Sequence, residues 1–252
     1  MVHVEGDHAE VRLPGQSGIS TLRFDSLRGV LLSSSPDRWP ELADRHLRIA
    51  LDAGTRGAER PPVTDLLPRV GPSRSERGAA TPWEESIVDG HLSLRLVVDL
   101  ENAVRFVRPL DLAHWGIALS DAKAAAVDNL RARTPEQALE PFDEGVYRVG
   151  LADSYDATRV LLAEQWFPHH AGVLAILPAR DVLFLVPVAG EEDVQRAGAL
   201  WSQVATSADR LPYPISRQLF WFGASSGARA IHVTLDGELY FPGDLAALID
   251  EQ

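Results

Sequence analysis

The stretch GVLAILPARDVLFLVPV, from Gly172 to Val188, contains two apolar segments joined by a short polar link. The segments are Gly172–Leu177 and Val182–Val188, and the link is Pro178–Asp181. Such a link between two strand-length segments predicts a β-hairpin with a tight turn. Both segments are apolar at odd and at even positions, so other elements should cover both faces of the hairpin. We therefore expect this hairpin to lie at the centre of a sheet.

The flanking sequence predicts strands and helices in no regular order. Upstream, Gly145–Leu151 predicts a strand, and Asp153 is expected to begin a helix, with Asp156 as an imperfect capping box. Downstream, acidic residues from Glu191 begin the strongest helical pattern of the chain. Further strands are expected at Leu219–Phe222, Ala230–Leu235 and Glu238–Phe241, with a last short helix capped by Asp244. This mixture predicts an α+β fold with mixed, largely antiparallel sheets and packed helices, because a doubly wound sheet would need alternating strands and helices.

The N-terminal half has the same mixed character. The expected elements are strands in the first 32 residues, a helix from the cap Ser35 to Gly54, a strand pair at His91–Val98 and Val104–Val107, and a helix from the cap Ser120 to about Arg133. The stretch Gly71–Thr81, rich in Gly, Pro, Arg and Ser, predicts a mobile loop. The chain is expected to form either one domain or two subdomains, 1–134 and 135–252.

Composition excludes several classes of protein. The 252 residues include no cysteine, which rules out disulfides, thiolate nucleophiles and zinc ribbons. The chain has no apolar run long enough to span a membrane, and its first residues lack the features of a secretory signal, so a cytoplasmic location is expected. The net charge of −12 argues against nucleic-acid binding and would suit a basic protein partner. We expect no cofactor, no membrane partner and no metal, while the oligomeric state stays open.

Two local motifs invite a catalytic or metal-binding interpretation. Gly223–Gly227 matches the G-x-S-x-G pattern of a nucleophile elbow, but a strand pattern follows it where the elbow needs a helix. We therefore interpret it as a hairpin loop without esterase activity. The adjacent pair His169 and His170 follows Phe167-Pro168 in a predicted surface loop, without a nearby ligand at metal-binding spacing.

Five charged residues form the candidate site: Asp153, Asp156, Arg159, Arg180 and Asp181. Arg159 lies one helical turn beyond Asp156, so the two should share a face. The Arg180-Asp181 pair sits in the turn of the central hairpin, and half-buried charges at such a place need partners. We expect the two segments to form one polar cluster. The cluster would either hold the turn in place or face a cleft as a binding or catalytic site; the catalytic residues themselves are not assigned.

Several short segments resemble a known family. They are Trp115-Gly116-Ile117, Ala126–Leu130, Asp65–Pro68, Asp153–Leu162 and Pro178–Leu183. Taken in their order along residues 60–190, they resemble motifs of the DUF1444 family of uncharacterised bacterial proteins, also called the YtpQ-like or UPF0354 group. The chain departs from the family at Ala179, where the family tends to have Asn. The resemblance implies a bacterial cytoplasmic protein of the same fold, and it implies no activity and no catalytic residue.

Two functions from different classes remain open. The first is a non-catalytic protein-binding or regulatory module, which the acidic surface and the lack of a complete catalytic motif favour. The second is a hydrolase-type enzyme that uses the five charged residues as acid and base groups. A deep polar pocket that joins residues 153–159 to residues 180–181 would favour the enzyme.

Overall fold

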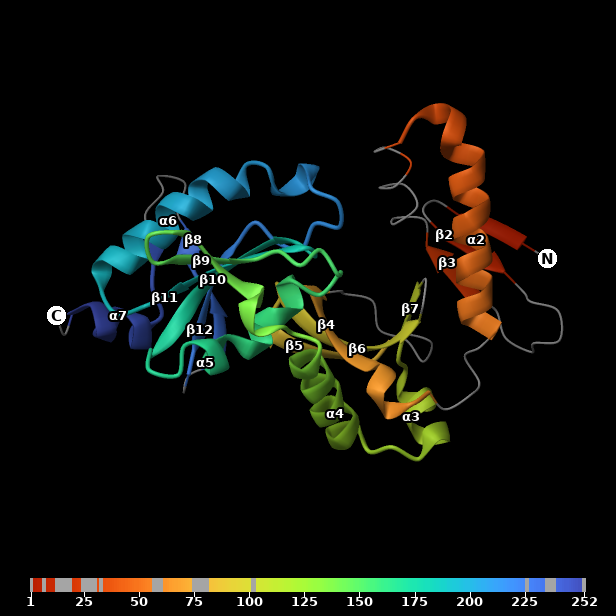
Figure 1. Cartoon of the computed structure of the whole chain (residues 1–252), viewed down its shortest axis with the longest axis horizontal. Helices are drawn as coiled ribbons and strands as arrows, with labels where there is room; N and C mark the ends of the chain where they lie inside the picture. The colour runs from red at the N-terminus through yellow and green to blue at the C-terminus, as the bar shows by residue number, and fades with distance from the viewer. Residues whose placement is uncertain are drawn as a thin grey trace.

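The computed structural model describes residues 2–5, 8–11, 20–23, 31, 34–55, 61–73, 82–100, 103–224, 227–233 and 239–250. These residues form helices packed on antiparallel sheets, which confirms the α+β class (Figure 1). Among them, no helix combines the length and the apolar character needed to cross a bilayer.

The N-terminal part forms a small antiparallel sheet and a long helix. The sheet has the order β1-β2-β3, with bounds Val2–Glu5, His8–Val11 and Ser20–Arg23. A single 3-10 turn, η1 (Pro36–Arg38), leads into helix α2 (Trp39–Thr55). Ser35 occupies the cap position before Pro36, as predicted, but its hydroxyl bonds to the side chain of Asp37 and to no backbone group of the helix.

A four-stranded sheet follows in the chain. Its strands are β4 (Leu66–Pro72), β5 (Glu84–Val88), β6 (Leu92–Leu100) and β7 (Ala103–Phe106). β6 pairs with the other three strands, and its pairing with β7 confirms the predicted hairpin. Helices α3 (Pro109–Trp115) and α4 (Leu119–Ala132) cover one face, where Trp115 and Ala126 pack against Leu96.

The second large sheet has the order β13-β12-β10-β11-β9-β8, with every neighbouring pair antiparallel. Its strands are β8 (Leu139–Asp143), β9 (Val146–Val149), β10 (Gly172–Ala179), β11 (Val182–Pro187), β12 (Leu219–Gly223) and β13 (Gly227–Ala230). The hairpin of β10 and β11 lies at its centre, as the sequence predicts, and only Arg180 and Asp181 remain in the turn.

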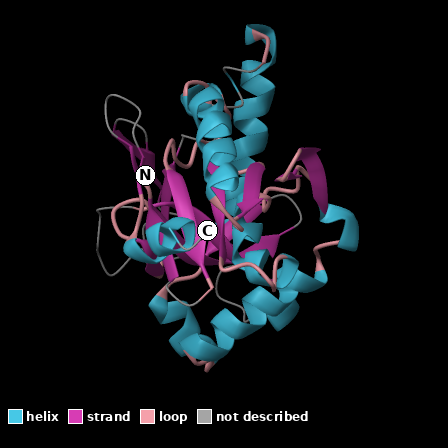
Figure 2. Cartoon of the chain, turned by 90° about the vertical axis from the view of Figure 1, so that its left-hand side faces the viewer, coloured by secondary structure: helices cyan, strands magenta, loops and turns pink. Residues whose placement is uncertain are grey.

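Both faces of the central hairpin are covered, because its side chains alternate between two cores. Leu174 and Ile176 pack with α6 (Glu191–Ala205) and α7 (Gly243–Asp250). Val173 and Leu177 pack on the other side with the 3-10 helix η5 (Ala157–Leu162) and with α5 (Ala163–Trp166). Figure 2 shows the strands in the middle of the molecule with helices on either side.

Short elements complete the described chain. They are the 3-10 turns η3 (Val63–Asp65), η4 (Glu136–Ala138) and η6 (Ala208–Arg210), and the strand pair β14 (His232–Val233) and β15 (Leu239–Tyr240). The strand expected at Ala230–Leu235 is therefore divided, because β13 ends at Ala230 and the backbone N–H of Ile231 bonds to the Leu219 carbonyl.

The two large sheets share one hydrophobic core. Val70, Leu92 and Leu94 of the four-stranded sheet pack with Val173 and Leu185 of the six-stranded sheet. The chain passes from one sheet to the other near residue 135, where the sequence places a boundary. The division into 1–134 and 135–252 stays a prediction.

Two further expected features differ from the structure. Gly71 and Pro72 belong to β4, although the sequence predicts a loop from Gly71, and residues 74–81 lie outside the described part. Proline is tolerated here because β4 is the terminal strand of its sheet, where a missing N–H breaks no ladder. The helix expected to be capped by Ser120 begins at Leu119 with Ala118 as its cap residue, and Ser120 bonds to the side chain of Asp121.

Candidate functional site

The candidate site begins in the loop between β9 and η5. Ala152 and Ser154 have positive φ angles of 56° and 74°, a conformation that costs energy for residues with a side chain. The carboxylate of Asp156 stabilises this loop, because its oxygens accept the backbone N–H groups of Leu151 at 3.0 Å and of Ala152 at 2.9 Å. Asp156 is fully buried. It thus secures the preceding loop, and the predicted role of Asp153 and Asp156 as helix caps is wrong.

The guanidinium of Arg159 joins both carboxylates. It donates to the two oxygens of Asp153 at 2.7 and 2.5 Å, to Asp156 at 3.1 Å, and through Nε to the Thr134 hydroxyl at 3.0 Å. Arg159 is only 1% exposed, and a buried guanidinium is tolerated when its donors are used in this way. The contact with Asp156 confirms that the two residues share a face.

The two carboxylates differ in their electrostatics. Burial raises the pKa of Asp156, against the lowering effect of its backbone donors. Burial also opposes ionisation of Asp153, but there the hydrogen bonds from Arg159 prevail and lower the pKa. The side chain of Asp153 is 40% exposed, so it is the carboxylate of this pair that meets solvent.

The hairpin turn lies directly beside this loop, as the sequence predicts. The backbone N–H of Ala157 donates to the carbonyl of Arg180 at 3.0 Å. The charged side chains of the turn nevertheless pair with each other, with Arg180 Nη2 at 3.1 Å from Asp181 Oδ2. Arg180 also stacks on the ring of Tyr213, 3.7 Å from its centroid. The segments meet through the backbone, while their side chains form separate ion pairs.

Four residues that the sequence analysis did not select complete the cluster. Buried Arg69 of β4 donates to the Ser154 carbonyl at 3.2 Å and lies 5.3 Å from the ring centroid of Tyr155. The Tyr155 hydroxyl donates to Asp99 at 3.0 Å, and Asp99 also pairs with Arg133 at 2.5 Å. Burial raises the pKa of Tyr155, so its hydroxyl stays protonated and acts as a donor. A charged residue within an apolar strand, such as Arg69, is the sequence signal for such a contact.

Charge is balanced across the cluster and the neighbouring hairpin turn taken together. Four arginines, Arg69, Arg133, Arg159 and Arg180, accompany four aspartates, Asp99, Asp153, Asp156 and Asp181. Burial lowers the pKa of Arg69, and Arg180 and Asp181 are close enough to influence it. A cluster without excess charge has no strong electrostatic preference for a charged ligand.

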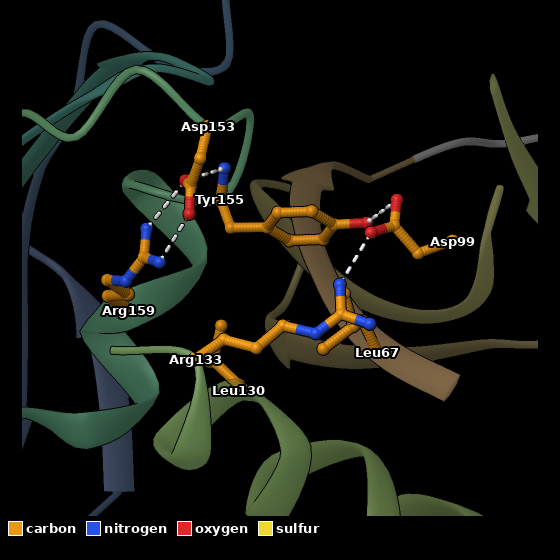
Figure 3. Close-up of a pocket in the computed structure, with 7 residues that line it drawn as sticks. All are labelled: Leu67, Asp99, Leu130, Arg133, Asp153, Tyr155 and Arg159. Atoms are coloured by element: carbon orange, nitrogen blue, oxygen red, sulfur yellow. Dashed lines mark hydrogen bonds and ion pairs between the residues drawn. The ribbon is translucent and has the colours of Figure 1, made fainter. Parts of the chain in front are cut away.

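A small cavity of about 100 Å³ lies beside the cluster. Its lining consists of Leu67, Asp99, Leu130, Arg133, Asp153, Tyr155 and Arg159 (Figure 3). Since one water molecule takes about 30 Å³ of liquid, the cavity has room for a few waters. Arg180 and Asp181 do not line it, so this cavity does not join the two predicted segments.

The other candidate motifs keep their structural interpretation. Gly223 and Gly227 pair across the antiparallel strands β12 and β13, which confirms the predicted hairpin, while Ser225 itself lies outside the described residues. His169 is exposed, and His170 stacks edge-on against Phe167. In the part of the chain that the structure describes, no group of three or more His, Asp or Glu side chains is placed to hold a metal.

Comparisons of the chain with protein-family models, with curated proteins and with solved structures found no match. Membership of the DUF1444 family therefore stays a prediction.

Proposed function

We propose that the protein is a cytoplasmic, non-catalytic protein-binding or regulatory module. The supporting observation is that the charged groups of the predicted cluster already have partners within the chain. Its carboxylates and guanidinium groups bind one another and nearby backbone groups, and the cavity beside them is about 100 Å³. Ligand pockets usually measure about 300–1,000 Å³, so this one has no room for an organic substrate. The charges serve to stabilise the loop and the turn.

The surface that best fits a protein partner is the acidic outer strand β8. Phe142 is 52% exposed there, and Glu140, Asp143 and Glu144 are exposed around it. An exposed aromatic ring amid like charges fits a partner with a basic rim and an apolar centre. Pro141 and a register shift near it disfavour addition of a further strand, so the contact would be made through side chains.

The experiment is a binding measurement with a matched control. Proteins captured from the native extract by the tagged chain are purified, and their affinity for the wild type, Phe142→Ala and Leu110→Ala is measured by calorimetry. Leu110 is the control because it is 61% exposed and lies in α3, away from β8. We expect a basic partner whose binding weakens at least tenfold in Phe142→Ala and not in Leu110→Ala.

A loss of binding in Phe142→Ala must be distinguished from a loss of the folded state. Phe142 stacks edge-on against Phe184 with ring centroids 5.1 Å apart, so the melting temperature of Phe142→Ala must be measured as well. A stoichiometric partner that binds Phe142→Ala as tightly as the wild type would rule out this surface. Absence of any stoichiometric partner would contradict the proposed function itself.

Backbone strain favours the hydrolase as the second candidate. Strained residues gather at active sites, and Ala152 and Ser154 flank Asp153, whose carboxylate is partly exposed. A hydrolase would use Asp153 as the base and the neighbouring cavity for water. The test is hydrolysis of p-nitrophenyl acetate and p-nitrophenyl phosphate. Activity that is lost in Asp153→Asn, with the folded state intact, would support the enzyme.

A further inference from the structure

A second, larger cavity lies where the two large sheets meet. Its volume is about 450 Å³, within the range of small-molecule sites. The four-stranded sheet contributes the end of β4 and the β5–β6 turn, and the six-stranded sheet contributes the end of β10 and the segment before β12. The lining residues are Pro72, Ser73, Gly90, His91, Pro178, Ala208 and Pro214–Gln218.

One wall of this cavity is held rigidly by backbone hydrogen bonds. The N–H groups of Ile215 and Ser216 donate to the carbonyls of Pro178 and Leu177 at 3.0 and 3.1 Å. The Arg217 carbonyl accepts the Trp201 indole N–H at 2.6 Å. The opposite wall is tied as well, since the Ser73 N–H donates to the His91 carbonyl at 3.0 Å. Groups held in this way lose little entropy when a ligand binds.

The charge of the lining differs from that of the chain. The protein has 36 acidic and 24 basic side chains, yet among the residues that the structure describes the titratable ones that line the cavity are His91 and Arg217, with no carboxylate beside them. Ser73, Ser216 and Gln218 add hydroxyl and amide groups. A guanidinium has five donors, so Arg217 can bind an anion in addition to its contacts within the chain.

The remaining lining is apolar, and part of it meets solvent. Pro178, Pro214 and Ile215 offer carbon surface for a ring or a short aliphatic body. Pro214 and Arg217 are exposed, so a ligand can reach the cavity from solution. Because the lining combines basic side chains with apolar surface, we propose that this cavity binds a small organic anion, namely a carboxylate or phosphate monoester carried on an apolar body. This site is separate from the surface proposed for a protein partner, because β11 and β9 lie between β10 and β8.

The test uses phenyl phosphate as the probe, with phenol and inorganic phosphate as its two halves. Calorimetry on the full chain is expected to show saturable binding of phenyl phosphate, with each half binding at least tenfold more weakly. Arg217→Gln and His91→Phe should each weaken phenyl phosphate binding at least fivefold, because the first replaces the charged fork of donors by a neutral amide and the second removes the ring N–H donor. The control is Arg210→Gln, an exposed arginine of the nearby turn η6 that does not line the cavity.

Three results would overturn the proposal. The first is that phenyl phosphate shows no saturable binding at 10 mM, roughly the weakest affinity that a specific site would show. The second is that phenol binds as tightly as phenyl phosphate. The third is that Arg210→Gln and Arg217→Gln lose the same affinity for phenyl phosphate, which would show attraction to surface charge in general. Melting curves establish that each variant is folded. If Arg217→Gln does not fold, Arg217→Lys replaces it. That variant keeps the charge but loses the fork of donors, so it should weaken binding by a smaller factor.

Discussion

At the scale of one residue, Asp156 shows how a buried carboxylate can stabilise a loop. Its carboxylate accepts hydrogen bonds from Leu151, Ala152 and Arg159, all within 3.1 Å. These bonds stabilise a loop in which Ala152 and Ser154 adopt positive φ angles. Without the carboxylate, two backbone N–H groups and part of a buried guanidinium would lose their partners.

We therefore expect Asp156→Ala to lower the free energy of unfolding by about 3 kcal/mol, the cost of orphaning a buried charge and its donors. Urea denaturation followed by circular dichroism measures this change. Asp181→Ala is the control, because Asp181 pairs with its neighbour Arg180 in a partly exposed turn and should cost less than about 1 kcal/mol. Similar losses for both variants would mean that Asp156 has no special role.

The pKa shifts predict how stability depends on pH. Asp153, and Asp111 of α3, whose carboxylate pairs with Arg108 at 2.8 Å, have pKa values lowered in the folded state, where their arginine partners outweigh the opposing effect of burial. Their stabilisation is therefore present above the unfolded pKa of about 3.9 and is lost as the pH falls through the lower folded pKa. Asp156 has a raised pKa, so its ionisation opposes folding at neutral pH and its protonation partly offsets the loss in acid.

For Asp153→Asn we expect a melting temperature below that of the wild type at pH 7, and a difference that shrinks as the pH falls below about 4. The measurement is a series of thermal melts from pH 7 to pH 3. A difference that stays constant over this range would show that the charge of Asp153 contributes nothing, and that any effect comes from packing.

At the scale of elements, the sequence predicts what has a strong local pattern. The hairpin of Gly172–Leu177 and Val182–Val188 was predictable because its runs are continuous and its link is short. Helix α3 and strand β5 were missed: α3 has only seven residues, too few to show a period, and β5 begins with two glutamates. β4 was missed as a whole because Pro68, Gly71 and Pro72 resemble a loop, and only pairing with β6 makes this segment a strand.

In the candidate site too, a contact could be predicted only where a local sequence pattern reports it. Asp156 and Arg159 are three residues apart, so their contact could be predicted from helical spacing. Asp153 lies in the loop before η5, and its contact with Arg159 depends on the path of that loop. Arg69 and Asp99 belong to distant strands, and no local pattern reports that the fold brings them to Ser154 and Tyr155. The ion pair of Arg180 with its neighbour Asp181 could be expected from the sequence, whereas no local pattern shows that Arg180 stacks on Tyr213.

Close packing between strands gives a prediction at this scale. A Cβ atom added at Gly172 would lie 2.4 Å from the Phe222 carbonyl oxygen and 2.5 Å from the Trp221 ring. Gly172→Ala should therefore destabilise the protein by about 1–3 kcal/mol, the usual cost of overpacking a core. Thermal denaturation checks this, with Gly243→Ala as the control because no atom lies within 4 Å of its added Cβ. A Gly172→Ala variant as stable as the control would mean that β10 and β12 can move apart.

At the scale of the whole molecule, the two large sheets depend on each other. Val70 and Leu94 of the four-stranded sheet pack in the same core as Ala157, Val173 and Leu185. Ala157 and Thr158 also bond to both parts, since the Val70 N–H of β4 donates to the Thr158 hydroxyl at 3.1 Å and the Ala157 N–H donates to the Arg180 carbonyl in the β10–β11 turn at 3.0 Å. Separating the halves would expose this apolar surface to water, at a cost of about 25 cal/mol for each Å².

We expect residues 61–250 to unfold as one cooperative unit, and residues 135–252 produced alone to lack a stable core. Differential scanning calorimetry of the full chain should give a single main transition for these two sheets, with the calorimetric enthalpy equal to the van't Hoff enthalpy. The isolated 135–252 chain should bind a hydrophobic dye and melt without a sharp transition.

Phe220→Ala truncates a fully buried ring in the shared core. In the full chain it should lower the temperature of the single transition without dividing that transition into two. Two resolved transitions, or a cooperative melt of 135–252 alone, would show instead that the chain forms two domains divided near residue 135.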